Sequence, residues 1–208
     1  MDNESQAQAT IDEYVIVRKL GEGKTAAVYE AVKKNEDGST EGVAVKVFKM
    51  AEEAQRPRLM QYLANELGPL RVCPPHPHIN RLIGICDTGS HKKRTGEVVD
   101  CIYAVQELAP MGELFDYVQF SKFDDCMIRV FAKQLFAGIK HMKDVGFCHR
   151  DLKPENVVVD QNFNLKIIDW GFAKAYTEGT LTQTFFGSGA YMAPEIRARE
   201  EYDAHKAD

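Results

Sequence analysis

A run of polar and charged residues, H-R-D-L-K-P-E-N at 149–156, carries the groups in this sequence that are best suited to chemistry. It follows an apolar helical pattern and precedes a short apolar hairpin at 156–168. Antiparallel pairing of that hairpin brings Asn156 close to Asp169. An amide oxygen and a carboxylate at adjacent strand ends suit a hard divalent cation such as Mg²⁺, which prefers oxygen ligands.

Two further charged side chains belong to the same run. Asp151 is a carboxylate one short loop away from the predicted cation ligands, where it is available as a base or as an orienting acceptor. Lys153 follows two residues later and brings an ammonium group that can meet developing negative charge. The run therefore predicts a base and a charge-stabilising group beside a cation site.

The segment V-A-V-K-V-F at 43–48 reads as a strand and adds a second cation. The period of two puts its three valines on one face and Ala44, Lys46 and Phe48 on the other. The small Ala44 leaves room for a flat ring, and Lys46 on the same face can reach a phosphate. An ammonium that faces a core needs an anionic partner, and Glu66 on the following helix is the best candidate.

The turn before this strand, L-G-E-G-K-T-A-A-V at 20–28, contains Gly21 and Gly23. Two glycines let a backbone approach a phosphate closely with its N–H groups pointing inward. Many hairpins contain the same G-x-G pattern, so this turn alone is weak evidence for a phosphate site.

These residues require elements that position them. The first half of the chain reads as strands and turns with one helix, residues 51–72. The second half reads as helices at 113–120 and 125–144, followed by the hairpin. The change of character predicts a strand-rich half and a helix-rich half joined by a linker near 107–112.

Length and composition bound the class of protein. A chain of 208 residues, 44% hydrophobic and 27% charged, suits one large globular domain or two small lobes. A net charge of −5 argues against nucleic-acid binding, and no apolar run reaches membrane-spanning length. The acidic start lacks the pattern of a signal peptide, and five dispersed cysteines suggest reduced thiols. We therefore expect an intracellular protein, cytoplasmic or nuclear, with no nucleic-acid or membrane partner.

Five motifs stand in a fixed order along the chain, and together they resemble those of a eukaryotic-type protein kinase. The motifs are G-E-G-K-T-A-A-V (21–28), V-A-V-K (43–46), H-R-D-L-K-P-E-N (149–156), D-W-G (169–171) and A-P-E (193–195). The resemblance implies an α+β, two-lobed fold with an antiparallel N-lobe sheet plus one helix and an incomplete, mainly helical C-lobe. The implied segments are a disordered leader at 1–10, an N-lobe at 11–106, a hinge at 107–112 and a partial C-lobe at 113–208.

The resemblance assigns catalytic roles residue by residue. Asp151 would accept the proton of the substrate hydroxyl, and Lys153 would steady the γ-phosphate of ATP. Lys46 would hold the α- and β-phosphates and pair with Glu66. The Mg²⁺ ligands implied by the resemblance are Asn156 and Asp169.

The resemblance also implies an adenine pocket and its phosphate loop. Glu113 would meet the ribose or a basic residue of the substrate. The other residues that would contact the nucleotide are Leu20, Gly21, Gly23, Val28, Ala44, Glu107, Ala109 and Val158. Ala26 stands where the third loop glycine is expected, and Trp170 replaces the usual phenylalanine of D-F-G.

The implied function is transfer of the ATP γ-phosphoryl group to serine or threonine hydroxyls of protein substrates. K-P-E-N after Asp151 resembles serine/threonine kinases, and G-S-G-A-Y-M-A-P-E at 187–195 resembles calmodulin-dependent and SNF1-like kinases. The alternative is a truncated, catalytically weak fragment that binds a nucleotide or another protein.

A loop rich in Gly, Ser and Thr at 172–192 resembles an activation loop, although a solvated flexible loop has the same composition. A phosphothreonine there would pair with Arg150. Thr184 is the predicted site, with Thr182 as the alternative. An upstream activating kinase is then a candidate partner.

The last stretch, E-E-Y-D-A-H-K-A-D at 200–208, resembles the entry to a central helix of the kinase C-lobe. Asp208 matches the residue whose carboxylate braces the H-R-D loop. The resemblance implies further helices after it, so we expect the 208-residue chain alone to be poorly soluble or inactive.

Overall fold

Strands dominate the first half of the chain and helices the second, as the hydrophobic periodicity predicts. The computed structural model describes residues 8–23, 25–49, 56–120, 123–175, 177 and 179–208. They fall into two compact units. Unit 1 comprises Met1–Leu59 and Leu82–Leu108, and unit 2 comprises Met60–Arg81 and Ala109–Asp208.

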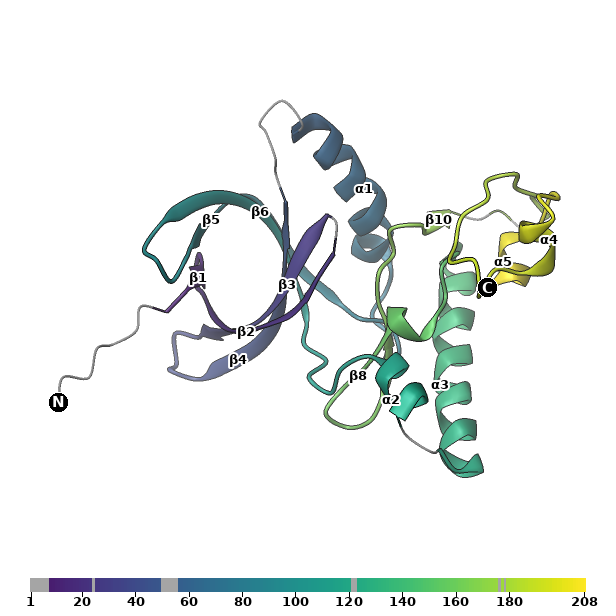
Figure 1. Ribbon diagram of the computed structural model, residues 1–208, viewed down its shortest axis with the longest axis horizontal. Coiled ribbons are helices and arrows are strands. Elements are labelled where there is room, and N and C mark those ends of the chain that lie inside the picture. The colour runs from purple at the N-terminus through teal and green to yellow at the C-terminus, as the bar shows by residue number, and fades with distance from the viewer. Residues whose placement is uncertain (1–7, 24, 50–55, 121–122, 176, 178) are drawn as a thin grey trace. The chain divides into compact units, whose positions relative to one another are not determined.

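Unit 1 is built on a closed antiparallel barrel with the strand order β1-β2-β3-β4-β6-β5 (Figure 1). Its strands are β1 (Thr10–Ile11), β2 (Tyr14–Glu22), β3 (Ala26–Lys34), β4 (Thr40–Phe48), β5 (Leu82–Lys92) and β6 (Val98–Glu107). The short β1 closes the barrel because it pairs with β2 on one side and with β5 on the other. Closure leaves no strand edge of the sheet unpaired around the ring.

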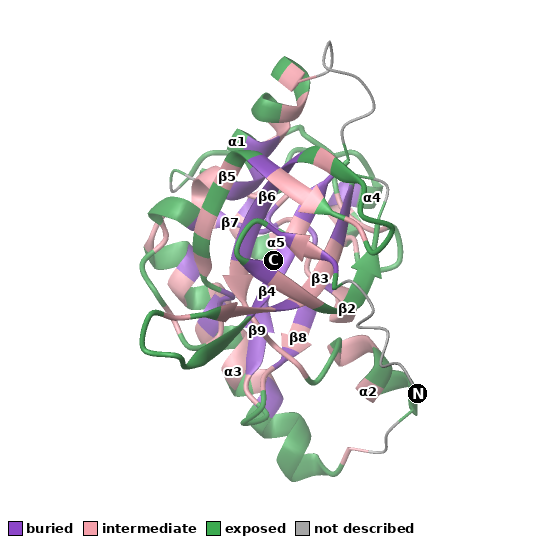
Figure 2. Cartoon of the chain, turned by 90° about the vertical axis from the view of Figure 1, so that its left-hand side faces the viewer, coloured by how far each residue is buried: buried purple, intermediate pink, exposed green. Residues whose placement is uncertain are grey.

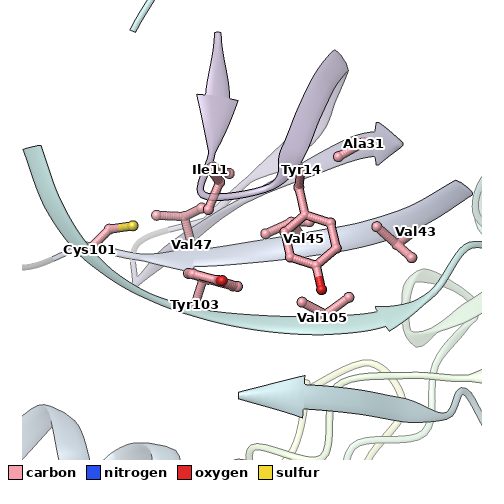
Figure 3. Close-up of a cluster of buried hydrophobic side chains, with 9 residues drawn as sticks. All are labelled: Ile11, Tyr14, Ala31, Val43, Val45, Val47, Cys101, Tyr103 and Val105. Carbon is pink, nitrogen blue, oxygen red and sulfur yellow. The ribbon is translucent and has the colours of Figure 1, made fainter. Parts of the chain in front are cut away.

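The core of the barrel follows the predicted alternation in β4. Val43, Val45 and Val47 are buried and belong to one hydrophobic cluster, which confirms the face assigned to them (Figure 3). The other buried members are Ile11, Tyr14, Ala31, Cys101, Tyr103 and Val105. Burial of a large apolar side chain such as that of a valine or an isoleucine contributes about 1.5–3 kcal/mol, so this cluster stabilises the barrel.

The start of the described chain is ordered, and this corrects the end of the predicted leader. Residues 1–7 lie outside the described part of the chain, but Thr10 pairs with Val15 of β2 and with Lys92 of β5. Asp12 anchors this segment, because its carboxylate accepts hydrogen bonds from Ser90 and from the Tyr103 hydroxyl. The pairing partners are distant in sequence, so local polarity gave no sign of them.

Helix α1 (Arg56–Val72) ends just before the proline-rich loop, as predicted. The first residues of its predicted range, 51–55, lie outside the described residues.

The stretch from Met60 to Arg81 belongs to unit 2, whereas we assigned it to the N-lobe from sequence. The reason is local pairing: Ile79 bridges Ile167, and the Asn80 amide donates to the Ile167 carbonyl at 3.0 Å.

Besides most of α1, unit 2 contains α2 (Leu114–Phe120) and α3 (Asp125–Asp144), which lie close to their predicted ranges. Its shorter elements are β7 (Phe147–Cys148), η2 (Pro154–Asn156), β8 (Val157–Val159), β9 (Leu165–Ile167), β10 (Lys174–Ala175), α4 (Pro194–Arg197) and α5 (Ala204–Ala207). Asp124 caps α3 by accepting a hydrogen bond from the Met127 amide at 2.7 Å.

The core of unit 2 lies between α3 and the β8–β9 hairpin. Phe131 of α3 packs with Val157, Val159 and Leu165 of the hairpin. Strand β9 is buried along its whole length, whereas the first turns of α3 are largely exposed (Figure 2). The hairpin is thereby fixed on the helix that precedes the H-R-D run. In the part of the chain that the structure describes, the helices are too short or too polar to span a membrane.

Candidate active site

One carboxylate binds two successive backbone amides of the loop that carries the H-R-D run. The backbone N–H groups of His149 and Arg150 donate to Asp208 Oδ2 at 2.5 Å and to Asp208 Oδ1 at 2.7 Å. Burial raises the pKa of Asp208 although these two hydrogen bonds act to lower it. Arg150 has a φ of 68°, in the left-handed region, so the loop turns sharply where the carboxylate binds it.

His149 packs inside unit 2 and does not face an open site. Its side chain is fully buried, and its Nε2 atom lies 2.9 Å from the Ile168 carbonyl oxygen. Its ring meets the buried Trp170 ring edge-on, with centroids 6.4 Å apart. The tryptophan of D-W-G therefore fills an aromatic core position, and it ties the hairpin end to the H-R-D loop.

Asp151 is buried, and both of its carboxylate oxygens accept hydrogen bonds. Oδ2 accepts from Lys153 Nζ at 2.7 Å and from Asn156 Nδ2 at 3.0 Å, and Oδ1 accepts from the Ser188 hydroxyl at 2.9 Å. Burial acts to raise the pKa of Asp151, but the hydrogen bonds from Lys153, Ser188 and Asn156 outweigh it and lower the pKa below its usual value. The carboxylate is therefore ionised at neutral pH and able to accept a proton.

The role of Ser188 was missed from sequence, where it was only one of several hydroxyls in the loop. Its oxygen also accepts a hydrogen bond of 2.7 Å from Lys153 Nζ. The contact joins two segments 37 residues apart, and the only local sign of it is the flanking pair of glycines in G-S-G.

The two predicted cation ligands lie at adjacent ends of the β8–β9 hairpin. Val157 pairs with Ile167, and the Ile168 amide donates to the Asn156 carbonyl at 2.9 Å. Asp169 follows directly, is exposed, and has a φ of 59° that turns the chain out of the strand. Asn156 uses its amide nitrogen on Asp151, so its amide oxygen is left for a cation.

The predicted nucleotide residues of unit 1 gather on neighbouring strands. Val28 pairs with Gly21 of β2 and with Lys46 of β4, and Ala44 lies two residues before Lys46 on the same face. A Cβ atom on Gly21 would have no described atom within 4 Å, so the backbone there is open to a ligand. Ala26 begins β3 and is not among the described non-glycine residues with positive φ, so the missing third glycine causes no strain.

The other predicted nucleotide residues are divided between the two units. Leu20, Gly23 and Glu107 belong to unit 1. Glu66, Ala109, Glu113 and Val158 belong to unit 2. Glu66 is buried in α1. The pairing of Lys46 with Glu66 and the assembly of one nucleotide site stay predictions.

Glu113 lies in an acidic part of unit 2. It forms an isolated bridge with Val158 of β8. Burial raises its pKa, and the nearby carboxylates of Asp116 and Glu155 raise it further. A cationic group placed here would relieve the repulsion between these carboxylates.

The predicted phosphorylation sites are tied to the H-R-D loop. Arg150 donates from Nη1 to Thr184 Oγ1 at 2.8 Å and from Nε to the Phe172 carbonyl at 2.7 Å. The hydroxyl of Thr182 lies 2.7 Å from that of Thr184, and the Tyr202 hydroxyl donates to the Thr184 carbonyl at 2.7 Å. Thr184 is therefore the loop threonine in direct contact with the arginine.

Comparison with known proteins supplies an independent test of the resemblance. Residues 14–208 match the family model described as protein kinase domain. CBL-interacting protein kinase 26 from Oryza sativa subsp. japonica is 35% identical over 201 residues, which cover 95% of this chain and 38% of that protein. CBL-interacting serine/threonine-protein kinase 19 from Arabidopsis thaliana is 36% identical over 210 residues, which cover 99% of this chain and 40% of that protein.

A more distant organism gives a similar match. The hormonally up-regulated neu tumor-associated kinase homolog from Xenopus tropicalis is 33% identical over 198 residues, covering 92% of this chain and 26% of that protein. The chain thus spans less than half the length of each of these relatives. The matches confirm the recognition made from the five motifs and the α+β fold that it implies.

Proposed function

Because the chain belongs to the protein kinase family, we propose that it transfers the γ-phosphoryl group of ATP to serine or threonine hydroxyls of protein substrates. The observation that carries this proposal is the hydrogen-bonded group around Asp151. A buried, ionised carboxylate accepts a hydrogen bond from a serine hydroxyl at 2.9 Å while an ammonium group touches both partners. This is the environment that an acceptor hydroxyl needs.

The proposed chemistry of unit 2 is positioning and charge stabilisation. Asp151 orients the substrate hydroxyl and accepts its proton as the oxygen attacks phosphorus. Lys153 lies 2.7 Å from Asp151 Oδ2, where its charge can also stabilise the phosphoryl group in transit. The low pKa of Asp151 keeps the acceptor ionised before the substrate binds.

Asn156 and Asp169 fit a Mg²⁺ ion, because both offer side-chain oxygens at adjacent strand ends. When bound, the ion would neutralise charge on the ATP phosphates. We propose that Lys46, Gly21 and Gly23 contact those phosphates. The proposed adenine and ribose contacts are Leu20, Val28, Ala44, Glu107, Ala109, Glu113 and Val158, and Glu66 is the proposed partner of Lys46.

Phosphorylation of Thr184 by an upstream kinase is the proposed activation step, with Thr182 as the alternative site. The contact between Arg150 and Thr184 supports it, because a phosphate on that oxygen would meet the guanidinium directly. Membership in a calmodulin-dependent or SNF1-like subgroup is a further proposal, supported by the G-S-G-A-Y-M-A-P-E loop.

A phosphotransfer assay with a degenerate peptide library beside small alcohols tests the proposed function. We expect labelled serine and threonine peptides and no labelled small alcohol. Asp151→Asn should abolish transfer while ATP binding, measured by calorimetry, stays nearly unchanged. Bound ATP with no transfer by the unmutated protein would favour the alternative, a nucleotide-binding module.

A further inference from the structure

Two distant points of the loop at 172–192 meet at the side chain of Arg150. The Phe172 carbonyl accepts a hydrogen bond of 2.7 Å from Arg150 Nε. The Phe186 ring faces the guanidinium, whose carbon atom lies 5.1 Å from the ring centroid. The two phenylalanine rings also contact each other, with centroids 5.4 Å apart. We name this group of Arg150, Phe172 and Phe186 the arginine clasp.

The contact between Arg150 and Phe186 has the geometry of a cation–π interaction. A guanidinium within about 6 Å of a ring centroid is attracted to the negative face of the ring. In the described part of the chain, no carboxylate forms an ion pair with the Arg150 side chain. Phe172 and Phe186 each remain 41% exposed, so burial of the rings is incomplete and the charge of Arg150 can be tested separately from apolar contact.

The clasp lies directly beside the proposed base. Arg150 precedes Asp151, and Phe186 stands two residues before Ser188, which donates to Asp151 Oδ1 at 2.9 Å. A Cβ atom on Gly187 would lie 3.2 Å from the Arg150 carbonyl oxygen, so the backbone between these two contacts is also tightly packed. Residues 186–188 therefore contact residues 150–151 at successive positions, and the Phe186 ring makes the first of these contacts.

This arrangement exists in the unmodified chain. Arg150 donates from Nη1 to the Thr184 hydroxyl at 2.8 Å, and that acceptor is neutral. The Phe172 carbonyl and the Phe186 ring are neutral as well. The loop is thus attached to the catalytic loop before any phosphate is present.

We propose that Phe186 is a positioning residue for phosphoryl transfer. Its ring binds the Arg150 guanidinium and so keeps residues 186–188 against Asp151 while the loop is unmodified. The inference rests on the proposed function, because the positioned group is the proposed base. Transfer by the unmodified chain should then depend on the ring of Phe186 and on the charge of Arg150.

Modification of arginines by phenylglyoxal, located by mass spectrometry, tests the clasp without requiring activity. The full chain is first treated with a phosphatase. Phe186→Leu keeps an apolar side chain but loses the ring, and it should raise the modification rate of Arg150 about two- to fivefold, the strength of an exposed cation–π contact. Arg129, which is exposed on α3, is the internal reference.

Two control variants separate the ring face from general disturbance of the loop. Phe186→Tyr keeps an aromatic face and should keep the protection of Arg150. Phe185→Leu makes the same substitution one residue earlier, where the ring contacts Tyr202 at 6.4 Å between centroids. It should leave the modification rate of Arg150 unchanged.

A double-mutant cycle tests the positioning role in the reaction. In the dephosphorylated chain, Phe186→Leu should lower kcat/KM for a peptide about two- to fivefold, and Phe186→Tyr should restore the rate. In an Arg150→Gln background, which lacks the cation, Phe186→Leu should have no further effect. Equal losses in both backgrounds would show that the ring acts through its bulk, and this would overturn the proposal.

Failure of this inference can be told from failure of the proposed function. An unchanged modification rate of Arg150 in Phe186→Leu overturns the clasp and leaves the kinase assignment intact. An unmutated chain that protects Arg150 but transfers no phosphoryl group overturns the proposed function, and the positioning role with it.

Discussion

Arg150 donates a hydrogen bond from Nη1 to Thr184 Oγ1 at 2.8 Å, and its guanidinium carbon lies 5.1 Å from the Phe186 ring centroid. The arginine next to the proposed base is thus already in contact with the proposed phosphorylation site. A phosphate on that oxygen would add charge-assisted hydrogen bonds to an existing contact, so the loop would be fixed more firmly to Arg150.

Phosphorylation of Thr184 should therefore raise kcat/KM for a peptide substrate about tenfold or more, since a few charge-assisted bonds order the loop. Thr184→Ala should lose this gain after treatment with an upstream kinase, and Thr182→Ala should keep most of it. The measurement is the peptide-kinase rate before and after that treatment. Equal activation of Thr184→Ala and the unmutated chain would refute the assignment.

Lys153→Met should lower kcat by about 10²-fold, because an ammonium group is lost beside developing negative charge. The pKa of Asp151 should rise in this variant, since burial would then be opposed only by Ser188 and Asn156. Activity requires the ionised carboxylate, so the acidic limb of the kcat/KM profile should move to higher pH. An unchanged acidic limb would show that Asp151 is not the titrating base.

The same pKa shift has a consequence for stability. The pKa of Asp151 is lower in the folded chain than in the unfolded one, so its ionisation stabilises the fold above the unfolded pKa. That contribution is lost as the pH falls through the folded pKa. Lys153→Met should therefore flatten the dependence of the unfolding free energy on pH in the acidic range below the ordinary pKa of an aspartate.

Asp208→Ala should loosen the catalytic loop, because the amides of His149 and Arg150 would lose their common acceptor. A hydrogen bond to a charged group contributes about 1.5–3 kcal/mol, so exchange of these two amides should accelerate by at least about tenfold. Asp208→Asn keeps one acceptor oxygen and should give an intermediate rate. Hydrogen exchange resolved at these two residues measures the effect, and no change in either variant would contradict the bracing role.

Sequence patterns predicted those features that depend on neighbours along the chain. The alternation Val43–Val47 and the hairpin that brings Asn156 toward Asp169 follow from a period of two and a short turn. The resemblance to SNF1-like kinases pointed to Thr184 as a phosphorylation site, which stays a prediction; the structure shows its contact with Arg150. The contact of Ser188 with Asp151 was missed, because it joins two loops and no periodicity encodes it.

The closing strand of the barrel was missed for the same reason. Thr10 lies in a polar stretch, and its order depends on pairing with Lys92 and on the hydrogen bond that the Tyr103 hydroxyl donates to Asp12. These partners are distant in sequence and come together only when the barrel forms, so the local sequence does not predict them. Gly89 lies directly against Tyr103 and Asp12 in this part of the barrel.

Gly89→Ala should destabilise unit 1, because a Cβ atom there would lie 2.3 Å from Tyr103 Cε1. Such overpacking costs about 1–3 kcal/mol. Gly84→Ala is the matched control in the same strand, since its Cβ would have no described atom within 4 Å. The urea concentration at the midpoint of unfolding should be lower for Gly89→Ala than for the unmutated chain, and it should be unchanged for Gly84→Ala. Similar midpoints for the two variants would mean that Tyr103 is not packed against β5.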